Sequence, residues 1–221
     1  MDLVAQARYW LERAQSQGHS EAALELGGLA EGEEAGLTLE DAVTIYEKII
    51  SVVEKEGRSS FNSLRATRRL GDIYFDGKVK RVPEPDKAIL CFRRLCRSVL
   101  EDISNFSWFR DFDSLYKLGL LLESKEGDDL IESFQCFKQI VTKASDTAPF
   151  PDLELRLGRM YEEGRGTEQD DGWAAYYYKL ALKKGNAEAG ERLARLHEQG
   201  RGLTWFEKIG AKLAQLMNPV K

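Results

Sequence analysis

The sequence predicts an all-α fold made of stacked helix pairs, and two observations support this prediction. The dipeptide Leu-Gly recurs at Gly27, Gly71, Gly119 and Gly158, and a degenerate copy has Ala194 in place of the glycine. The intervals of about 36 to 48 residues are the size of a two-helix repeat. Between these anchors apolar residues recur at helical spacing, and no stretch alternates strictly enough to predict a strand.

Each anchor is expected in a first helix, helix A, which a turn joins to a second helix, helix B. In the fourth copy, helix A carries Leu157 and Tyr161 on one face, the glycines of EGRG (163–166) end it, and helix B follows through WAAYYYKLAL (173–182). A glycine inside a helix costs about 1 kcal/mol relative to alanine. Its recurrence at the anchors predicts that another helix crosses helix A too closely for a side chain.

Helix B keeps a register of its own, which assigns positions to two of the three cysteines. Small residues align its copies at Ala42, Ala88, Ser133 and Ala174. The third residues after them share a position that is expected to point inward: Ile45, Cys91, Cys136 and Tyr177. The fourth residues align in the same way: Tyr46, Phe92, Phe137 and Tyr178. Cys91 and Cys136 are therefore predicted to be buried small hydrophobic residues. With Cys96 they form no C-x-x-C motif, which favours a reducing compartment.

The repeats predict one α-solenoid across residues 1–221. Residues 8–22 overlay on 175–189, so residues 1–18 are interpreted as an N-terminal half-repeat helix. Four repeats are expected at 19–57, 63–101, 113–144 and 152–185, and a C-terminal repeat or cap at 186–217. The prolines of VPEPD (82–86) and APFPD (148–152) are predicted helix breaks, because proline disfavours helix at the residue before it.

These motifs resemble the Sel-one-like repeat family, a branch of the tetratricopeptide-type α-solenoids. The fourth copy matches best, at Leu157, Gly158, Tyr161, Gly164, Gly166, Asp170, Ala174, Tyr177, Tyr178, Ala181 and Gly185. The first and third copies depart from the pattern, with Ala30 and Leu122 in place of the tyrosine. The resemblance implies a right-handed superhelix of antiparallel helix pairs and a role as adaptor or scaffold. It implies no particular reaction or partner.

The A helices of such arrays generally line the concave face, so the partner site is sought there. Positions two residues before and one after each anchor share a helical face. From the second copy onward these positions are mostly basic, and we call them the basic ladder: Arg69, Lys117, Arg156, Arg159, Arg192 and Arg195.

Two interpretations of the basic ladder remain open. It is either a solvated face whose arginine stems cover neighbouring helices, or a groove for an acidic peptide, a phosphoryl group or a partner's carboxylates. In the groove interpretation, charge reversal at Arg69 and Arg156 is expected to weaken capture of the partner without unfolding the protein.

A second candidate interface lies in the segment SNFSWFRDFDSLY (104–116). Its aromatic residues are Phe106, Trp108, Phe109 and Phe112. Exposed aromatic side chains often anchor interfaces. The alternative is that they fill the space between the second and third repeats, and Trp108→Ala would separate the two interpretations by its effect on melting temperature.

Enzymatic chemistry is not expected from this sequence. The motifs GxSxG, HExxH and GxxxxGK[ST] are absent, and His19 and His197 stand where other copies carry unrelated residues. GRGTEQDDG (164–172) lacks the alternating ligands of a calcium loop. We therefore expect no metal and no other cofactor.

The sequence predicts a non-enzymatic adaptor that holds a segment of a partner protein on the concave A-helix face, and the groove interpretation of the basic ladder makes that segment an acidic one. The alternative is a bacterial immunity or inhibitor protein that neutralises a cognate toxin or effector enzyme. A net charge of −5 makes nucleic acid an unlikely partner. No apolar run reaches the length of a membrane span, and MDLVAQARYW (1–10) lacks the pattern of a signal peptide, so a cytoplasmic location is expected unless a leader has been removed.

Overall fold

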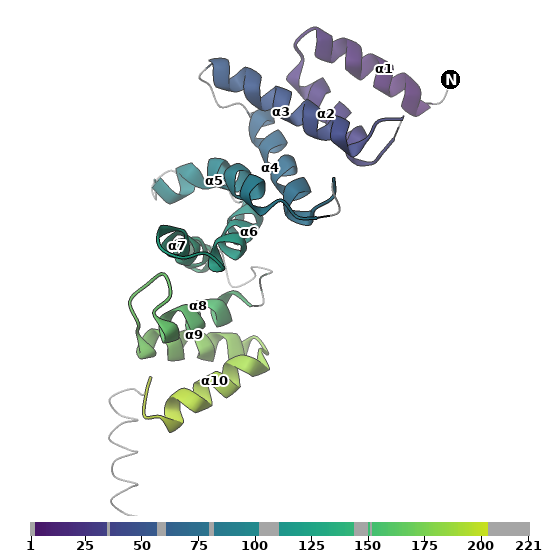
Figure 1. Cartoon of the computed structure of the whole chain (residues 1–221). Helices are drawn as coiled ribbons and strands as arrows, with labels where there is room; N and C mark the ends of the chain where they lie inside the picture. The colour runs from purple at the N-terminus through teal and green to yellow at the C-terminus, as the bar shows by residue number, and fades with distance from the viewer. Residues whose placement is uncertain are drawn as a thin grey trace, which may run out of the picture. The chain divides into compact units, whose positions relative to one another are not determined.

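The computed structural model describes residues 3–34, 36–56, 61–79, 82–101, 111–143, 150 and 152–202. They form ten α-helices and include no strand, so the all-α prediction is confirmed (Figure 1). The helices are α1 (Leu3–Ser16), α2 (Ser20–Glu31), α3 (Leu39–Glu56), α4 (Phe61–Asp76), α5 (Pro85–Glu101), α6 (Phe112–Glu123), α7 (Asp128–Lys143), α8 (Leu153–Glu163), α9 (Asp171–Lys183) and α10 (Ala187–Glu198).

The anchors lie in the even-numbered helices, which are the A helices, and α3, α5, α7 and α9 are the B helices that follow them. The first to fourth repeats are thus α2 with α3, α4 with α5, α6 with α7, and α8 with α9. The chain divides into two compact units, Met1–Leu118 and Gly119–Lys221. In the first unit α1 packs on α2, α2 on α3 and α4, and α4 on α3 and α5; in the second, α8 packs on α7 and α9, and α9 on α10. One continuous solenoid across both units stays a prediction.

The helix ends follow the local sequence. Pro85 opens α5, where its fixed φ suits the first helical position and its missing N–H loses nothing. Asp170 caps α9 by accepting a hydrogen bond from the backbone N–H of Trp173 at 2.9 Å. Gly164 ends α8 in the left-handed conformation, with φ 68° and ψ 30°, as the glycine-rich turn predicts.

The anchor glycines are crossed by aromatic side chains of helix B, as predicted. A Cβ atom built on any of them would lie less than 3.0 Å from a ring carbon of the aromatic residue in its own repeat. The pairs are Gly27 with Tyr46, Gly71 with Phe92, Gly119 with Phe137, and Gly158 with Tyr178. All four rings are fully buried, so each repeat is held by the fit of one ring onto bare helix backbone.

At the small position of helix B all four residues are fully buried: Ala42, Ala88, Ser133 and Ala174. Among the cysteines, Cys136 and Cys96 are buried as free thiols. Cys91 is only partly covered, so full burial was wrong for this residue. Burial still raises the pKa of the Cys91 thiol to about 11, which keeps it protonated and weakly nucleophilic at neutral pH.

The turns between helices A and B dock on the preceding helix B in the second unit. A side chain at Gly166 would collide with the carbonyl oxygen of Leu130 in α7. Gly202 makes the equivalent approach to α9, where a Cβ would lie 2.8 Å from the carbonyl oxygen of Asp171. Arg201 reinforces this contact with two bonds to the Asp171 carboxylate, at 2.7 and 3.0 Å. The second glycine of the turn is therefore a contact between repeats.

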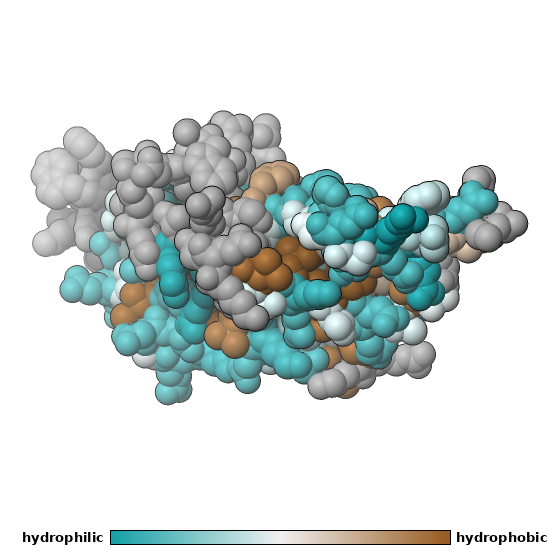
Figure 2. All heavy atoms as spheres, turned by 90° about the horizontal axis from the view of Figure 1, so that it is seen from above, coloured by the Kyte–Doolittle hydropathy of each residue, from teal (hydrophilic) through white to brown (hydrophobic). Residues whose placement is uncertain are grey.

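Hydrophilic residues dominate the described surface in the view of Figure 2, and hydrophobic residues are visible between them. Within the described part of the chain, no helix combines the length and the apolar character that crossing a membrane requires.

Candidate protein-interaction surface

The basic ladder forms ion pairs between successive A helices. In each of four A helices, the cation two residues before the anchor position pairs with a carboxylate on the preceding A helix. The pairs are Arg69 with Glu31 at 3.0 Å, Lys117 with Asp72 at 2.7 Å, Arg156 with Glu123, and Arg192 with Glu162 at 3.1 Å. These side chains are only partly exposed, so the pairs stabilise the stacking of repeats more than exposed surface pairs do.

The acidic partner occupies a repeat position of its own, four residues after the anchor glycine: Glu31, Glu123 and Glu162. The second repeat has Phe75 there. Lys117 instead bonds Asp72 and also Asp113, and its Nζ lies 5.6 Å from the centre of the Phe75 ring. Burial alone would lower the pKa of Lys117, but hydrogen bonds to the two carboxylates outweigh it and raise the pKa.

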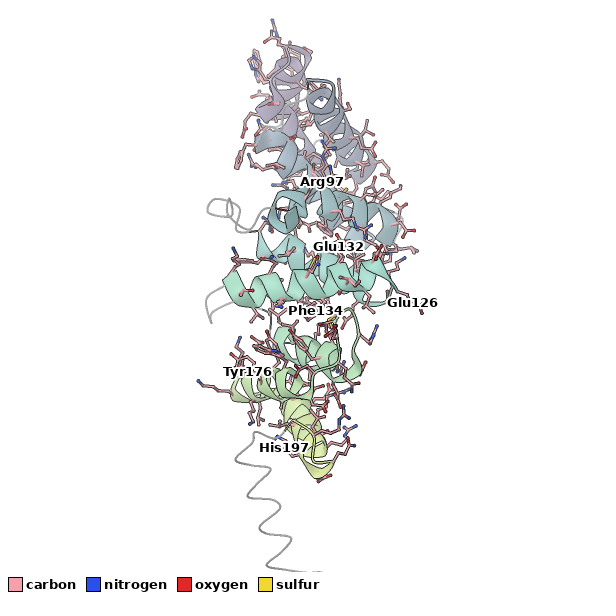
Figure 3. The ribbon with its side chains drawn as sticks, turned by 90° about the vertical axis from the view of Figure 1, so that its left-hand side faces the viewer. Arg97, Glu126, Glu132, Phe134, Tyr176 and His197 are labelled. Carbon is pink, nitrogen blue, oxygen red and sulfur yellow. The ribbon has the colours of Figure 1, made fainter. Side chains whose placement is uncertain are left out.

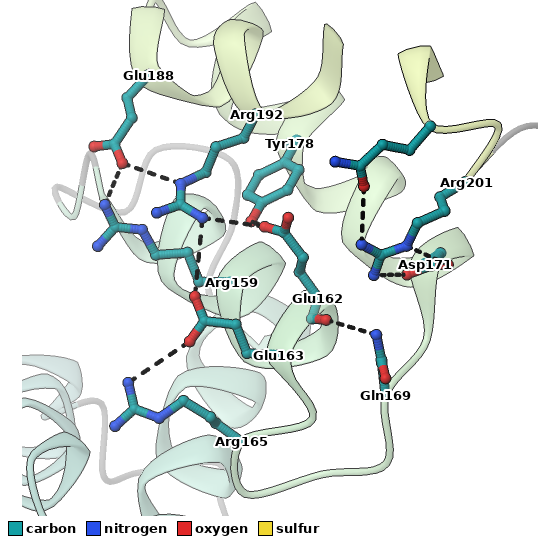
Figure 4. A network of polar contacts seen from close by, with 11 residues as sticks. Arg159, Glu162, Glu163, Arg165, Gln169, Asp171, Tyr178, Glu188, Arg192 and Arg201 are labelled. Carbon is teal, nitrogen blue, oxygen red and sulfur yellow. Dashed lines mark hydrogen bonds and ion pairs between the residues drawn. The ribbon is translucent and has the colours of Figure 1, made fainter. Parts of the chain in front are cut away.

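Two of these carboxylates also accept a hydrogen bond from the aromatic residue that covers the anchor glycine. The hydroxyl of Tyr46 donates to Glu31, and that of Tyr178 donates to Glu162. Figure 4 shows the second case, in which Glu162 lies between Tyr178 of its own repeat and Arg192 of the next A helix. Burial and the neighbouring carboxylate raise the pKa of both tyrosines, so both hydroxyls stay protonated donors.

The remaining ladder residues lie near the C-terminal end of the described chain. Arg159 of α8 pairs with Glu188 of α10, which also receives Arg192 at 3.1 Å (Figure 4). These two hydrogen bonds lower the pKa of the Glu188 carboxyl. Arg195 is exposed, and no described residue forms an ion pair with it. Five of the six ladder cations are thus paired within the protein.

An open cavity of about 330 Å³ lies on α2 and α4 in the first unit, and most of its lining is charged. Four cations and two carboxylates line it: Arg65, Arg68, Arg69 and Lys78, with Glu31 and Asp72. Arg65 forms an ion pair with Glu21 at 3.1 Å. Sequence reasoning placed only Arg69 of these cations in a candidate site. Arg65 lies one helical turn before Arg69, and Arg68 is the residue next to it. Neither stands at a ladder position.

The predicted aromatic interface lies mostly outside the described residues, because Phe106, Trp108 and Phe109 belong to 102–110. Phe112 is the first residue of α6 and is half-buried. Neither interpretation of this segment gains a test from the structure.

The described residues contain no group of three or more His, Cys, Asp and Glu side chains that could hold a metal ion. His19 stands at the N-cap position of α2 and is exposed, and His197 lies half-buried in α10.

Comparisons with known proteins agree with the repeat architecture. The Sel1 repeat family matches this chain at residues 4–19, 64–98 and 151–186. A protective antigen of uropathogenic Escherichia coli with an SLR fold is 20% identical over 91% of this chain, with a TM-score of 0.55, and this chain spans 38% of its length. A Sel1 repeat protein from Oxalobacter formigenes is 20% identical over 89% of this chain and 69% of its own, with a TM-score of 0.49. No curated protein matches the sequence. The fold is that of the all-α helical-repeat solenoids.

Proposed function

The chain is a Sel1-like repeat protein, and we propose that it binds an acidic segment of a partner protein on the A-helix face of its first unit. Proteins of this family are generally non-catalytic scaffolds for protein–protein interaction. The α2–α4 cavity is the observation that supports this face, because its four cations outnumber its two carboxylates in a chain with a net charge of −5.

The pairing of the ladder explains why this cavity is favoured over the other A helices. Arg156 and Arg192 each lie against a carboxylate of the preceding A helix, so little positive charge is left for a ligand. The cavity cations are paired as well, but Arg68 and Lys78 are more exposed than Arg156 and Arg192. Arg68 is 3.3 Å from Asp111 and its side chain is 47% exposed. A guanidinium that keeps free N–H groups can bind a partner's carboxylate with two parallel hydrogen bonds.

The proposal is tested with a labelled hexapeptide of alternating Glu and Gly, whose binding to the full chain is followed by fluorescence anisotropy. Arg68→Gln combined with Lys78→Gln should weaken binding roughly fivefold to tenfold, because two exposed charges leave the cavity. These positions are better than Arg69 and Arg156, since charge reversal there would place two carboxylates together and disturb the stacking of helices.

The matched control is Arg195→Gln, which removes an exposed ladder cation from the second unit. This variant should leave the affinity for the peptide unchanged. A peptide in which Gln replaces Glu should not bind the unmodified protein. Equal weakening by Arg195→Gln, or unchanged binding by the double variant, would show that the cavity is not the site.

A further inference from the structure

Helix α9 presents an exposed pair of aromatic side chains that the core does not need. Trp173 and Tyr176 are each 50% exposed, and their rings meet edge to face at 5.5 Å and 87°. Figure 3 labels Tyr176, which lies on the outer side of its helix. Trp173 is held from below because its inner face stacks on the buried Tyr161 at 6.0 Å and 24°. The pair is therefore a fixed platform with one face open.

This platform forms one wall of an open depression of about 420 Å³, lined by Asp170, Gly172, Trp173 and Tyr176. The backbone N–H of Trp173 holds the Asp170 carboxylate through the cap hydrogen bond, so a negative charge is oriented beside the rings. Gly172 contributes no side chain, and a Cβ added there would lie 3.1 Å from the Asp170 carboxylate. Glu168 adds a second exposed carboxylate in the adjoining turn.

In the second repeat a lysine stands at the position of Trp173 and lies on the equivalent tyrosine. Lys87 precedes Ala88 as Trp173 precedes Ala174, and Tyr74 follows its anchor glycine by three residues as Tyr161 does. There the Lys87 ammonium lies 4.8 Å from the centre of the Tyr74 ring. A cation is thus placed on an aromatic face at the position where the fourth repeat has an indole.

A second exposed aromatic pair, on α1, already holds a cation. Tyr9 and Trp10 are 54% and 61% exposed and meet edge to face at 5.3 Å and 73°. The guanidinium of Arg13 lies 5.9 Å from the centre of the Trp10 ring. In the described part of the chain, no cation occupies the rings of Trp173 and Tyr176.

We propose that Trp173, Tyr176 and Asp170 form a binding site for an arginine or lysine side chain in a basic segment of a partner protein. The ring faces attract the cation through their quadrupoles, and Asp170 supplies the opposite charge. This site goes beyond the acid-binding cavity proposed above, since it lies in the second unit, on a B helix, and selects the opposite charge.

The test is a titration of the full chain with the peptide acetyl-Gly-Arg-Gly-amide, followed by the indole N–H resonance of Trp173 and the backbone amide of Tyr176. The neutral control peptide carries citrulline, which keeps the shape of arginine without its charge. We expect saturable shifts at both groups with the arginine peptide and none with citrulline. The indole of Trp10 is an internal control, because the Arg13 guanidinium already lies over its ring.

Trp173→Ala should weaken binding roughly threefold to thirtyfold, the range that cation–π contacts span. Asp170→Asn should weaken it by a smaller factor while keeping the helix cap, because asparagine caps helices as well as aspartate does. Equal shifts with the citrulline peptide, or unchanged affinity in both variants, would overturn the proposal. Neither result bears on the acidic hexapeptide, so the two proposals fail or survive separately.

Discussion

The first and fourth repeats cover the anchor glycine with a tyrosine, whereas the second and third cover it with a phenylalanine. All four pack an aromatic ring of helix B onto the anchor glycine of helix A. Only Tyr46 and Tyr178 also donate a hydrogen bond to the carboxylate that bridges to the next A helix. Phe92 and Phe137 make the same ring contact without that bond. The ring contact therefore builds the repeat, and the hydroxyl adds a link between packing inside a repeat and pairing between repeats.

The largest expected effect comes from removing the ring, which both kinds of repeat share. Tyr178→Ala and Phe137→Ala should each lower the free energy of unfolding by about 3 to 5 kcal/mol, because each leaves a cavity over the glycine. Urea denaturation followed by far-UV circular dichroism measures the loss. A cost much smaller in Phe137→Ala than in Tyr178→Ala would mean that the hydroxyl, and not the ring, carries the stability.

The next effect separates the two phenylalanine repeats from each other. Phe137→Tyr adds a hydroxyl group in the repeat that has Glu123 four residues after its anchor, at the position of the acceptors Glu31 and Glu162. The free energy of unfolding should therefore stay equal or rise slightly. Phe92→Tyr places it against Phe75, whose ring lies 6.3 Å from that of Phe92 and offers no acceptor. An unpaired buried hydroxyl should cost about 1 to 3 kcal/mol. The same denaturation experiment decides, and equal costs in the two variants would contradict the assigned role of Glu123.

At two adjacent glycines of α2, substitution by alanine is expected to have smaller effects on stability, and the two effects should have opposite signs. Gly27 lies under the Tyr46 ring, whereas an added Cβ at Gly28 meets no atom within 4 Å. Gly28→Ala should stabilise by about 1 kcal/mol through helix propensity. Gly27→Ala gains the same propensity but should be destabilising overall, because overpacking costs about 1 to 3 kcal/mol. Melting temperatures that move in the same direction for both variants would remove the packing explanation for the anchors.

The smallest effect is a pH dependence to which the hydroxyls of Tyr46 and Tyr178 contribute. The pKa values of Tyr46 and Tyr178 are raised above the ordinary value of 10.0 in the folded protein. Above pH 10 the unfolded chain therefore releases protons that the folded chain keeps, and this contribution to stability, complete below pH 10, is lost as the pH rises. Denaturation at a series of alkaline pH values should show a shallower loss for Tyr46→Phe with Tyr178→Phe than for the unmodified protein. Parallel stability profiles for the two proteins would show that folding does not raise the pKa values of these two tyrosines.

Much of the fold could be predicted from the sequence, because aligning the repeats with one another shows which residue types recur at each position. Four glycines at the same helical position predicted a close crossing before any ring was placed on them. The helix B register predicted the burial of Cys136. It overestimated the burial of Cys91, which is only partly covered.

The candidate site was predicted less completely. The spacing of the basic ladder was visible, but its partners were overlooked, although glutamates recur four residues after three of the anchors. That signal was available. The cavity itself was not, because Glu31 of α2 meets the cations of α4 only when these two helices pack.

By itself the sequence determined the helix pairs, their register and the residues at which A and B helices touch, because these depend on spacing within about 48 residues along one chain. The tertiary structure decided which charges remain available to a partner. Ion pairs such as Arg192 with Glu162 join residues on different A helices, and whether a cation meets a carboxylate within reach depends on how those helices approach each other. The exposure of the Trp173 ring also depends on tertiary structure. One face of the ring stacks on Tyr161, and half of the side chain stays exposed.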